Sequence, residues 1–454
     1  MRTGPRAGSL DTDDASMSST NVEKQESFVH TFRHCWPLLF ALLFLGGTSF
    51  GVATMVKTFE IDPIYGNWTM AQYRQDATLG EGCRAVDHEV PWRELKRKLL
   101  RCRRGQYYDP MHNDCAECPA DSPDDKVFAV FWETQSNCQN LVGNPHTRFL
   151  THIMWSFVEP GEDGTVPSEF QYWSQEHIKD CILQLRMYEI CIHDVRCIKN
   201  MVAIGGVTAR ERFLELKDPA NLERFKHSYT LKCDVVVVVA YVRFGFDGID
   251  IDDETGNMKG THQDWLTHHG PVVVNYLQAL RDGLDAIQRP DEPRYLLTWD
   301  EFPSAWDPPD PANEHYTGCI SFHEDYDGWH RCYEPRISAL VDMVNVMFYN
   351  IDSGDVRIAS WVYELVLKDT LPVKAAAVIP KNKIVVDACS GQGCVSDQPI
   401  GQEVYNAGNG SAFYRGTMLW SATIDILLEN LSSISRMGRA GNYGVKMPFR
   451  GKFT

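Results

Sequence analysis

The feature that most constrains this chain is a run of acidic residues inside an apolar segment. Residues 246–254 read Phe-Asp-Gly-Ile-Asp-Ile-Asp-Asp-Glu, which places carboxylates at Asp250, Asp252, Asp253 and Glu254. In a β-strand the side chains alternate between two faces, so Asp250, Asp252 and Glu254 would share one face and Asp253 would lie on the other. Carboxylates stacked on one face repel one another, which costs stability and separates their pKa values. The pattern favours an enzyme that needs a protonated acid beside ionised or proton-sharing neighbours.

From residue 127 onward, short apolar runs alternate with longer amphipathic stretches. Eight runs are predicted to be strands: Val127–Trp132, His152–Phe157, Met201–Gly206, Gly248–Glu254, Tyr295–Trp299, Val344–Tyr349, Lys383–Val386 and Thr417–Ser421. Most pairs leave room for a helix between them, which is typical of a parallel α/β fold, the TIM (β/α)8 barrel. The carboxyl ends of barrel strands form the active-site face, so Glu254 would lie there.

A long apolar segment separates a polar head from the rest of the chain. Residues 1–34 are polar and Ser/Thr-rich and are predicted to be a disordered cytoplasmic tail. Residues 35–56 are nearly free of charge, and about 20 apolar residues suffice to span a bilayer as a helix. This predicts a single-pass membrane protein whose catalytic domain is luminal or extracellular. Cleavage after Ala53 would instead make the segment a signal peptide and the protein secreted.

Cysteine usage agrees with a chain that leaves the cytosol. Of the 14 cysteines, all but Cys35 follow the apolar segment, as expected in a compartment that permits disulfides. Residues 57–124 are predicted to form a small cysteine-rich stalk, and residues 125–454 form the barrel domain. The stalk cysteines are Cys83, Cys102, Cys115 and Cys118, and the glycosylation sequons start at Asn67, Asn409 and Asn430.

No motif predicts a resident metal or cofactor. A calcium loop, the alternative interpretation of residues 246–254, needs its glycine and oxygen ligands at other offsets and does not alternate with isoleucine. Cys115-x-x-Cys118 lacks a second Cys/His pair at zinc-finger spacing. His262, His268 and His269 match no metal motif, and a solvated helix start explains them better. The net charge of −17 argues against nucleic acid and anionic membrane surfaces as partners.

The acidic segment resembles the signature of glycoside hydrolase family 18, the chitinases and their relatives. Asp247, Asp250, Asp252 and Glu254 fill all four positions of its Asp-x-x-Asp-x-Asp-x-Glu pattern. Three further motifs follow the family's order: Met201–Gly206 resembles Ser-x-Gly-Gly of strand three with Ala203 for Ser, Val344–Asn350 resembles Met-x-Tyr of strand six, and Gly416–Ser421 resembles strand eight. The resemblance spans roughly residues 125 to 425 and implies a family 18 barrel.

The resemblance implies a role for each matching residue. Glu254 is the general acid, Asp252 binds the acetamido N–H, and Asp250 shares a proton with Asp252. Tyr349 donates to the acetamido carbonyl, and Trp420 stacks beneath the sugar at the cleavage point. In this family the substrate's own acetamido oxygen, not a second carboxylate, attacks the anomeric carbon. Further substrate-binding positions are Met347, Asn350, Asp247, Gly206 and Phe131.

The implied activity is hydrolysis of β-1,4 N-acetylglucosamine linkages in chitin or chito-oligosaccharides. Asp253 before Glu254 is similar to some endo-β-N-acetylglucosaminidases of the family, which cut the chitobiose core of N-glycans. A chitin-binding lectin without catalysis is the third alternative, although such members have usually lost the catalytic Glu or an Asp of the signature. The substrate therefore stays open between chitin and the N-glycan core. Glu133, Asp300 and Glu301 follow predicted strands and are expected to be exposed loop acids.

Overall fold

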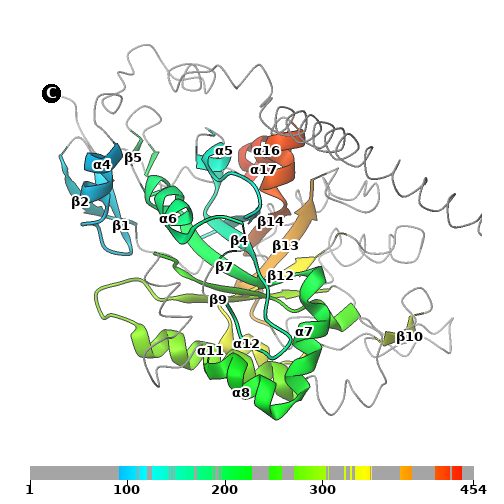
Figure 1. Cartoon of the computed structure of the whole chain (residues 1–454). Coiled ribbons are helices and arrows are strands. Elements are labelled where there is room, and N and C mark those ends of the chain that lie inside the picture. The colour runs from blue at the N-terminus through cyan, green and yellow to red at the C-terminus, as the bar shows by residue number, and fades with distance from the viewer. Residues whose placement is uncertain are drawn as a thin grey trace, which may run out of the picture. The chain divides into compact units, whose positions relative to one another are not determined.

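The computed structural model describes most of the chain between Trp92 and Gly441 (Figure 1). The longer described stretches are residues 92–109, 112–119, 125–142, 149–167, 172–186, 197–227, 245–257, 270–302, 333–347, 379–390, 415–429 and 432–441. The predicted tail, the apolar segment and the three sequons lie outside the described residues. Among the helices that are described, none is both long and apolar enough to cross a membrane.

Eight parallel strands close into a barrel, which confirms the predicted fold. In barrel order they are β3 (Val127–Glu133), β4 (His152–Val158), β7 (Lys199–Gly205), β8 (Gly248–Asp252), β9 (Leu296–Glu301), β12 (Met343–Met347), β13 (Ile384–Cys389) and β14 (Gly416–Trp420). The last strand, β14, pairs in parallel with the first, β3. Each predicted strand overlaps one of these, because strands buried on both faces read as near-continuous apolar runs.

The described helices lie outside the barrel strands (Figure 1). They are α5 (Gln139–Val142), α6 (Gln175–Gln184), α7 (Arg210–Leu214), α8 (Pro219–His227), α11 (Gly270–Ile287), α12 (Ile337–Leu340), α16 (Ala422–Leu428) and α17 (Ser432–Gly441), with α4 (Trp92–Leu99) in the cysteine-rich region. The outward face of each strand packs against them in one large core that contains Ile249, Ile251 and Tyr276. Burial of these apolar side chains is the main force that holds helices to the barrel.

The inside of the barrel has an apolar half and a polar half. Strands β3, β4, β7 and β14 contribute Phe131, Met154, Met201 and Met418 among other apolar side chains. Strands β8, β9, β12 and β13 place polar side chains at the equivalent inward positions: Asp250, Asp252, Thr298, Asp300, Asn345 and Asp387, each at most 4% exposed. The barrel interior is therefore divided between hydrophobic packing and a buried network of acids.

This arrangement corrects one prediction about loop acids. Asp300 and Glu301 are part of β9 and are 0% and 1% exposed, so the expectation that they are exposed loop acids is wrong. The strand extends two residues beyond the predicted Trp299, which carries both acids into the barrel wall. Glu301 accepts a hydrogen bond from the Trp299 indole at 3.1 Å. Glu133 is half-buried at the end of β3 and accepts from the Ser421 hydroxyl at 3.1 Å.

The described part of the predicted stalk packs on the barrel. A hairpin of β1 (Gln106–Asp109) and β2 (Asp114–Glu117) is closed by the disulfide Cys102–Cys115, and Cys118–Cys197 ties the region to the residues just before β7. The Arg104 guanidinium lies 3.5 Å over the ring of Tyr295, just before β9. The attachment is thus at the amino ends of the strands, opposite Asp252.

The remaining described pairs of strands are short. They are β5 (Tyr188–Glu189) with β6 (Asp194–Val195) and β10 (Phe322–His323) with β11 (Gly328–Trp329), both antiparallel. Single 3-10 turns occur at η3 (Val207–Ala209), η4 (Glu215–Lys217), η5 (Glu254–Asn257) and η9 (Lys381–Lys383).

A glycine sets the distance between β7 and the acidic strand β8. Gly205 has a φ of +129°, and a Cβ there would lie 2.0 Å from the carbonyl oxygen of Asp252. The next residue, Gly206, donates its N–H to that same oxygen at 2.9 Å. A side chain at Gly205 would push the two strands apart where the acids are placed.

We expect Gly205→Ala to reduce the free energy of unfolding by on the order of 3 kcal/mol, because it combines an unfavourable backbone conformation with a backbone clash. Gly245→Ala is the control, since Gly245 also has a positive φ of +99° but its nearest neighbour is 3.5 Å from the added Cβ. Gly245→Ala should cost about 1 kcal/mol. Urea unfolding followed by tryptophan fluorescence measures both, and equal losses would contradict the argument.

We also expect stability to fall as pH rises. Burial, followed by the charge of Asp250, raises the pKa of Asp387 well above the ordinary 3.8, and neither carboxylate oxygen of Asp387 has a hydrogen-bond partner among the described residues. The folded protein then binds this proton more tightly than the unfolded chain, so this stabilisation is full below the unfolded pKa and is lost as pH rises through the folded pKa. Asp387→Asn should make the fall from pH 5 to pH 8 shallower in unfolding experiments. Asp282→Asn, on the exposed face of α11, should leave the slope unchanged.

Candidate active site

Strand β8 delivers its acids to the carboxyl end of the barrel. Ile249 and Ile251, which alternate with the acids along the strand, belong to the outer core. Asp250 and Asp252 therefore point inward. The strand ends at Asp252, and Glu254 begins the 3-10 turn η5. The predicted strand was therefore two residues too long, but its alternation of faces is correct for the residues within it.

Asp253 points away from the barrel interior. Its carboxylate accepts hydrogen bonds from the Tyr276 hydroxyl at 2.6 Å and from the Thr255 hydroxyl and N–H at 2.6 and 3.1 Å. It is 1% exposed. Asp253 holds the turn after β8 against α11 and does not face a ligand inside the barrel. The residue that resembles the endo-β-N-acetylglucosaminidases thus has a structural role here.

Asp250 is embedded in a network on the polar side of the barrel. The Thr298 hydroxyl donates to Asp250, and the Asn345 amide donates to Asp300 at 2.7 Å and to Asp250 at 3.4 Å. Burial raises the pKa of Asp250 to about 6, while the hydrogen bond from Thr298 acts in the opposite direction. Asn345 therefore bridges Asp250 and Asp300, a neighbour that the sequence did not reveal.

Asp252 has an acceptor atom that no described residue uses. Its Oδ1 is buried and has no hydrogen-bond partner among the described residues. Burial raises the pKa of Asp252 well above its usual value, the charges of Glu254 and Asp250 raise it further, and the charge of Arg210 lowers it. An unpaired buried oxygen costs free energy, so this atom is suited to accept a hydrogen bond from a ligand.

Tyr349 lies on the polar side of the same site. It is 7% exposed, and burial followed by the charges of Asp387 and Asp252 raises its pKa well above 10.0. The phenol is therefore a neutral donor at physiological pH. Met347, at the end of β12, is buried at an inward position, two residues along the strand from Asn345. Asn350, the remaining strand-six prediction, lies outside the described residues.

Three aromatic rings form a floor on the apolar side. Trp420, at the end of β14, stacks with Phe157 at 5.6 Å between ring centroids and meets the edge of Phe131 at 5.4 Å. Phe131 is buried, whereas Phe157 and Trp420 are partly exposed. Phe157 was not predicted as a site residue, although it ends the second predicted strand. A flat, partly exposed indole backed by two rings can stack against a sugar.

Two predicted substrate-binding residues have other roles in the structure. Asp247 precedes β8, at the opposite end of the strand from Glu254, where its carboxylate accepts from Arg186 at 2.9 Å and from the Asn200 N–H at 2.8 Å. The prediction that Asp247 binds substrate is wrong, because a strand separates it from the acids. Gly206 lies at the carboxyl end of the barrel strands, on the side of the acids. Its N–H donates to the backbone carbonyl of Asp252, and it packs on the ring of Phe157.

The general acid predicted from the sequence has a cationic partner. Arg210, the first residue of α7, donates from Nη2 to Glu254 Oε2 at 2.5 Å. Arg210 was not predicted from the sequence, although it follows the Gly205-Gly206 pair closely. Asn345 and Asp387 were not predicted either, although polar residues inside otherwise apolar strands are a recognisable signal.

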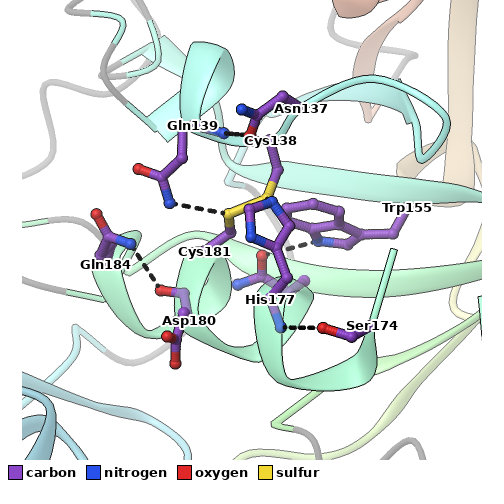
Figure 2. The surroundings of a disulfide bond; sticks show 10 residues. Asn137, Cys138, Gln139, Trp155, Ser174, His177, Asp180, Cys181 and Gln184 are labelled. Carbon is purple, nitrogen blue, oxygen red and sulfur yellow. Dashed lines mark hydrogen bonds between the residues drawn. A yellow bond between two sulfur atoms is a disulfide. The ribbon is translucent and has the colours of Figure 1, made fainter. Parts of the chain in front are cut away.

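One cluster of described residues has the composition of a metal site. Among the described residues, Cys138, His177 and Cys181 bring ligand atoms within 4.8 Å of one another. Cys138 and Cys181 are joined in a disulfide, so neither sulfur is a thiolate (Figure 2). Figure 2 shows the His177 ring beside the sulfurs, with Nε2 3.2 Å from Cys138 Sγ. The Cys138–Cys181 disulfide links α6 to the start of α5, outside the barrel.

Comparison with known proteins gives a family. The family "Glycosyl hydrolases family 18" matches residues 127–386, more than half of the chain. Similar solved structures include a family 18 chitinase from Cycas revoluta in complex with (GlcNAc)3, with 16% identity, a TM-score of 0.46, and 69% of this chain and 99% of that chain covered. A family 18 N-acetylglucosaminidase from Paenibacillus barengoltzii has 14% identity and a TM-score of 0.45, with 70% and 100% covered. No curated protein matches the chain.

The family match agrees with the geometry. It covers β3 to β13 and includes the acids of β8 and the strand-six motif. Because the match extends over more than half of the sequence, the resemblance inferred from the motifs is confirmed. The chain belongs to family 18 of the glycosyl hydrolases and is a glycosidase.

Proposed function

We propose that this glycosidase hydrolyses β-1,4 linkages between N-acetylglucosamine units in chitin or chito-oligosaccharides. The observation that carries the proposal is the free buried acceptor of Asp252, between Glu254 and the network around Asp250, opposite the aromatic floor. An acceptor for an N–H beside a neutral phenol donor suits an acetamido group, which offers one N–H and one carbonyl oxygen.

A sugar stacked on Trp420 would place its acetamido group toward the polar side of the barrel. Asp252 would accept the acetamido N–H, and Tyr349 would donate its hydroxyl to the acetamido carbonyl. Both contacts hold the carbonyl oxygen in position to attack the anomeric carbon. Since the protein supplies no nucleophile in this scheme, a sugar without the N-acetyl group would not react.

Glu254 would act on the leaving group. As the carbonyl oxygen bonds to the anomeric carbon, the glycosidic bond breaks and Glu254 gives its proton to the departing oxygen. The cyclic oxazolinium cation is stabilised by the carboxylate of Asp252. Water then attacks the anomeric carbon and returns a proton to Glu254, which reopens the ring and retains the configuration. Burial raises the pKa of both Asp250 and Asp300, which disfavours two negative charges beneath the site.

We expect Glu254→Gln to slow cleavage of the N-acetylglucosamine pentamer by at least about 100-fold, because general acid catalysis is worth roughly 10²–10⁴. Products are read by mass spectrometry, and calorimetry checks that the variant still binds the pentamer. Glu211→Gln, an exposed neighbour on α7, should retain full turnover. Circular dichroism confirms that both variants are folded.

The same assay separates the alternative substrates. A high-mannose glycopeptide is incubated in parallel with the pentamer. Cleavage of the glycopeptide alone would replace the chitinase proposal with an endo-β-N-acetylglucosaminidase that cuts the N-glycan core. Binding of the pentamer with no turnover of either substrate would mean that this chain acts as a lectin.

We propose in addition that residues 35–56 anchor the protein in a membrane, with residues 57–454 luminal or extracellular. Three disulfides between described cysteines support a compartment outside the cytosol. The described residues 92–119 attach at the barrel end opposite the acids.

The full chain expressed in cells should stay in the membrane pellet after carbonate extraction, and removal of N-glycans should lower its mass. The reason is that a retained apolar helix does not dissociate at high pH, whereas a peripheral protein does. Recovery of a shortened, soluble chain from the medium would support signal cleavage instead.

A further inference from the structure

The ion pair between Arg210 and Glu254 is not required by the proposed chemistry. Arg210 Nη2 lies 2.5 Å from Glu254 Oε2, and the two side chains are 24% and 13% exposed. Arg210 Nε is buried and has no hydrogen-bond partner among the described residues. Within the part of the chain that is described, Glu254 is therefore the group that the guanidinium binds.

This pairing conflicts with the role of a general acid. Glu254 has to carry a proton when the glycosidic oxygen departs. A guanidinium within hydrogen-bonding distance favours the ionised carboxylate. The pairing therefore suits the enzyme before substrate binds, and it must change before cleavage.

We propose that Arg210 is a positioning residue that holds Glu254 ionised in the free enzyme until a bound sugar displaces the guanidinium. The proposal rests on the proposed function of Glu254. Once displaced, Arg210 stays in contact with water, since its side chain is already partly exposed. Glu254 then takes up from solvent the proton that it donates to the leaving sugar.

The surroundings of Glu254 explain why this one cation matters. The ionisable groups on the described elements packed against it are Arg210, Glu211 and Arg212 on α7, Asp252 and Asp253 beside it, Asp300 and Glu301 on β9, and Tyr349. Arg212 forms an ion pair with Glu159, and the side chain of Glu211 is exposed. Among these described groups, Arg210 is therefore the cation that opposes the acids, and its removal would leave Glu254 with mainly like charges on the described elements around it, which favour the protonated form.

The pH dependence of kcat/KM on a chito-oligosaccharide tests the proposal, because kcat/KM reports ionisations of the free enzyme. Its basic limb marks the loss of the proton from Glu254. In Arg210→Met that limb should move to higher pH by about one unit or more. The basic limb of kcat should move less, since the sugar has already displaced Arg210 in the complex. Arg210→Lys, which keeps the charge, should remain near the wild-type profile.

Arg212→Met is the matched control. Arg212 lies two residues further along α7 and also forms an ion pair, but with Glu159. Arg212→Met should leave the basic limb of kcat/KM unchanged. An unshifted limb in Arg210→Met, or an equal shift in Arg212→Met, would overturn the proposal. Should Arg210→Met fail to fold, Arg210→Gln removes the charge and carries the same test.

A measurement without turnover separates this proposal from the proposed function. The protein is labelled with glutamate carrying ¹³C in the side-chain carboxyl, and its NMR titration is followed in the wild type and in Arg210→Met. The resonance lost in Glu254→Gln assigns Glu254. A higher titration midpoint in Arg210→Met supports the pairing even if no sugar is cleaved, whereas identical midpoints refute it even if the enzyme is a chitinase.

Discussion

The structure depends on carboxyl groups buried inside a parallel barrel. Asp250, Asp300 and Asp387 are each 0% exposed, and an isolated buried carboxylate costs too much free energy to stay ionised without compensation. The network meets this cost in two ways: burial raises the pKa of all three acids, which favours their protonated forms, and Thr298 and Asn345 donate hydrogen bonds to Asp250 and Asp300. These hydrogen bonds join three neighbouring strands, so the same interactions that satisfy the acids also fix the register of β8, β9 and β12.

The division of the barrel interior decides how a sugar can be oriented. The aromatic floor of Phe131, Phe157 and Trp420 faces the half of the barrel that carries the acids. A pyranose ring has an apolar face and polar edges, so it can stack on one side while its substituents reach the other. On the side of the acids, Gly205 allows β7 to approach the backbone of Asp252 closely.

Stability and chemistry are found at opposite ends of the strands, as is general for such barrels. The cysteine-rich region is bound at the amino ends by the Cys118–Cys197 disulfide and by Arg104 stacked on Tyr295. Asp247, paired with Arg186, belongs to this structural end despite its place in the signature motif. The family signature therefore combines residues of two kinds, and only its last acids reach the site.

The sequence by itself determined the eight strands and the inward placement of Asp250 and Asp252, because the period of a strand and its apolar pattern are local properties. It also indicated Glu254, Tyr349 and Trp420 through motif position. Only the tertiary structure decided that Asn345 bridges Asp250 and Asp300, that Asp253 turns outward to Tyr276, and that Arg210 meets Glu254. Arg210 and Glu254 are 44 positions apart, and their contact exists only because neighbouring strands bring the ends of two loops together. Burial and partner choice depend on that three-dimensional placement, which no local pattern of residues encodes.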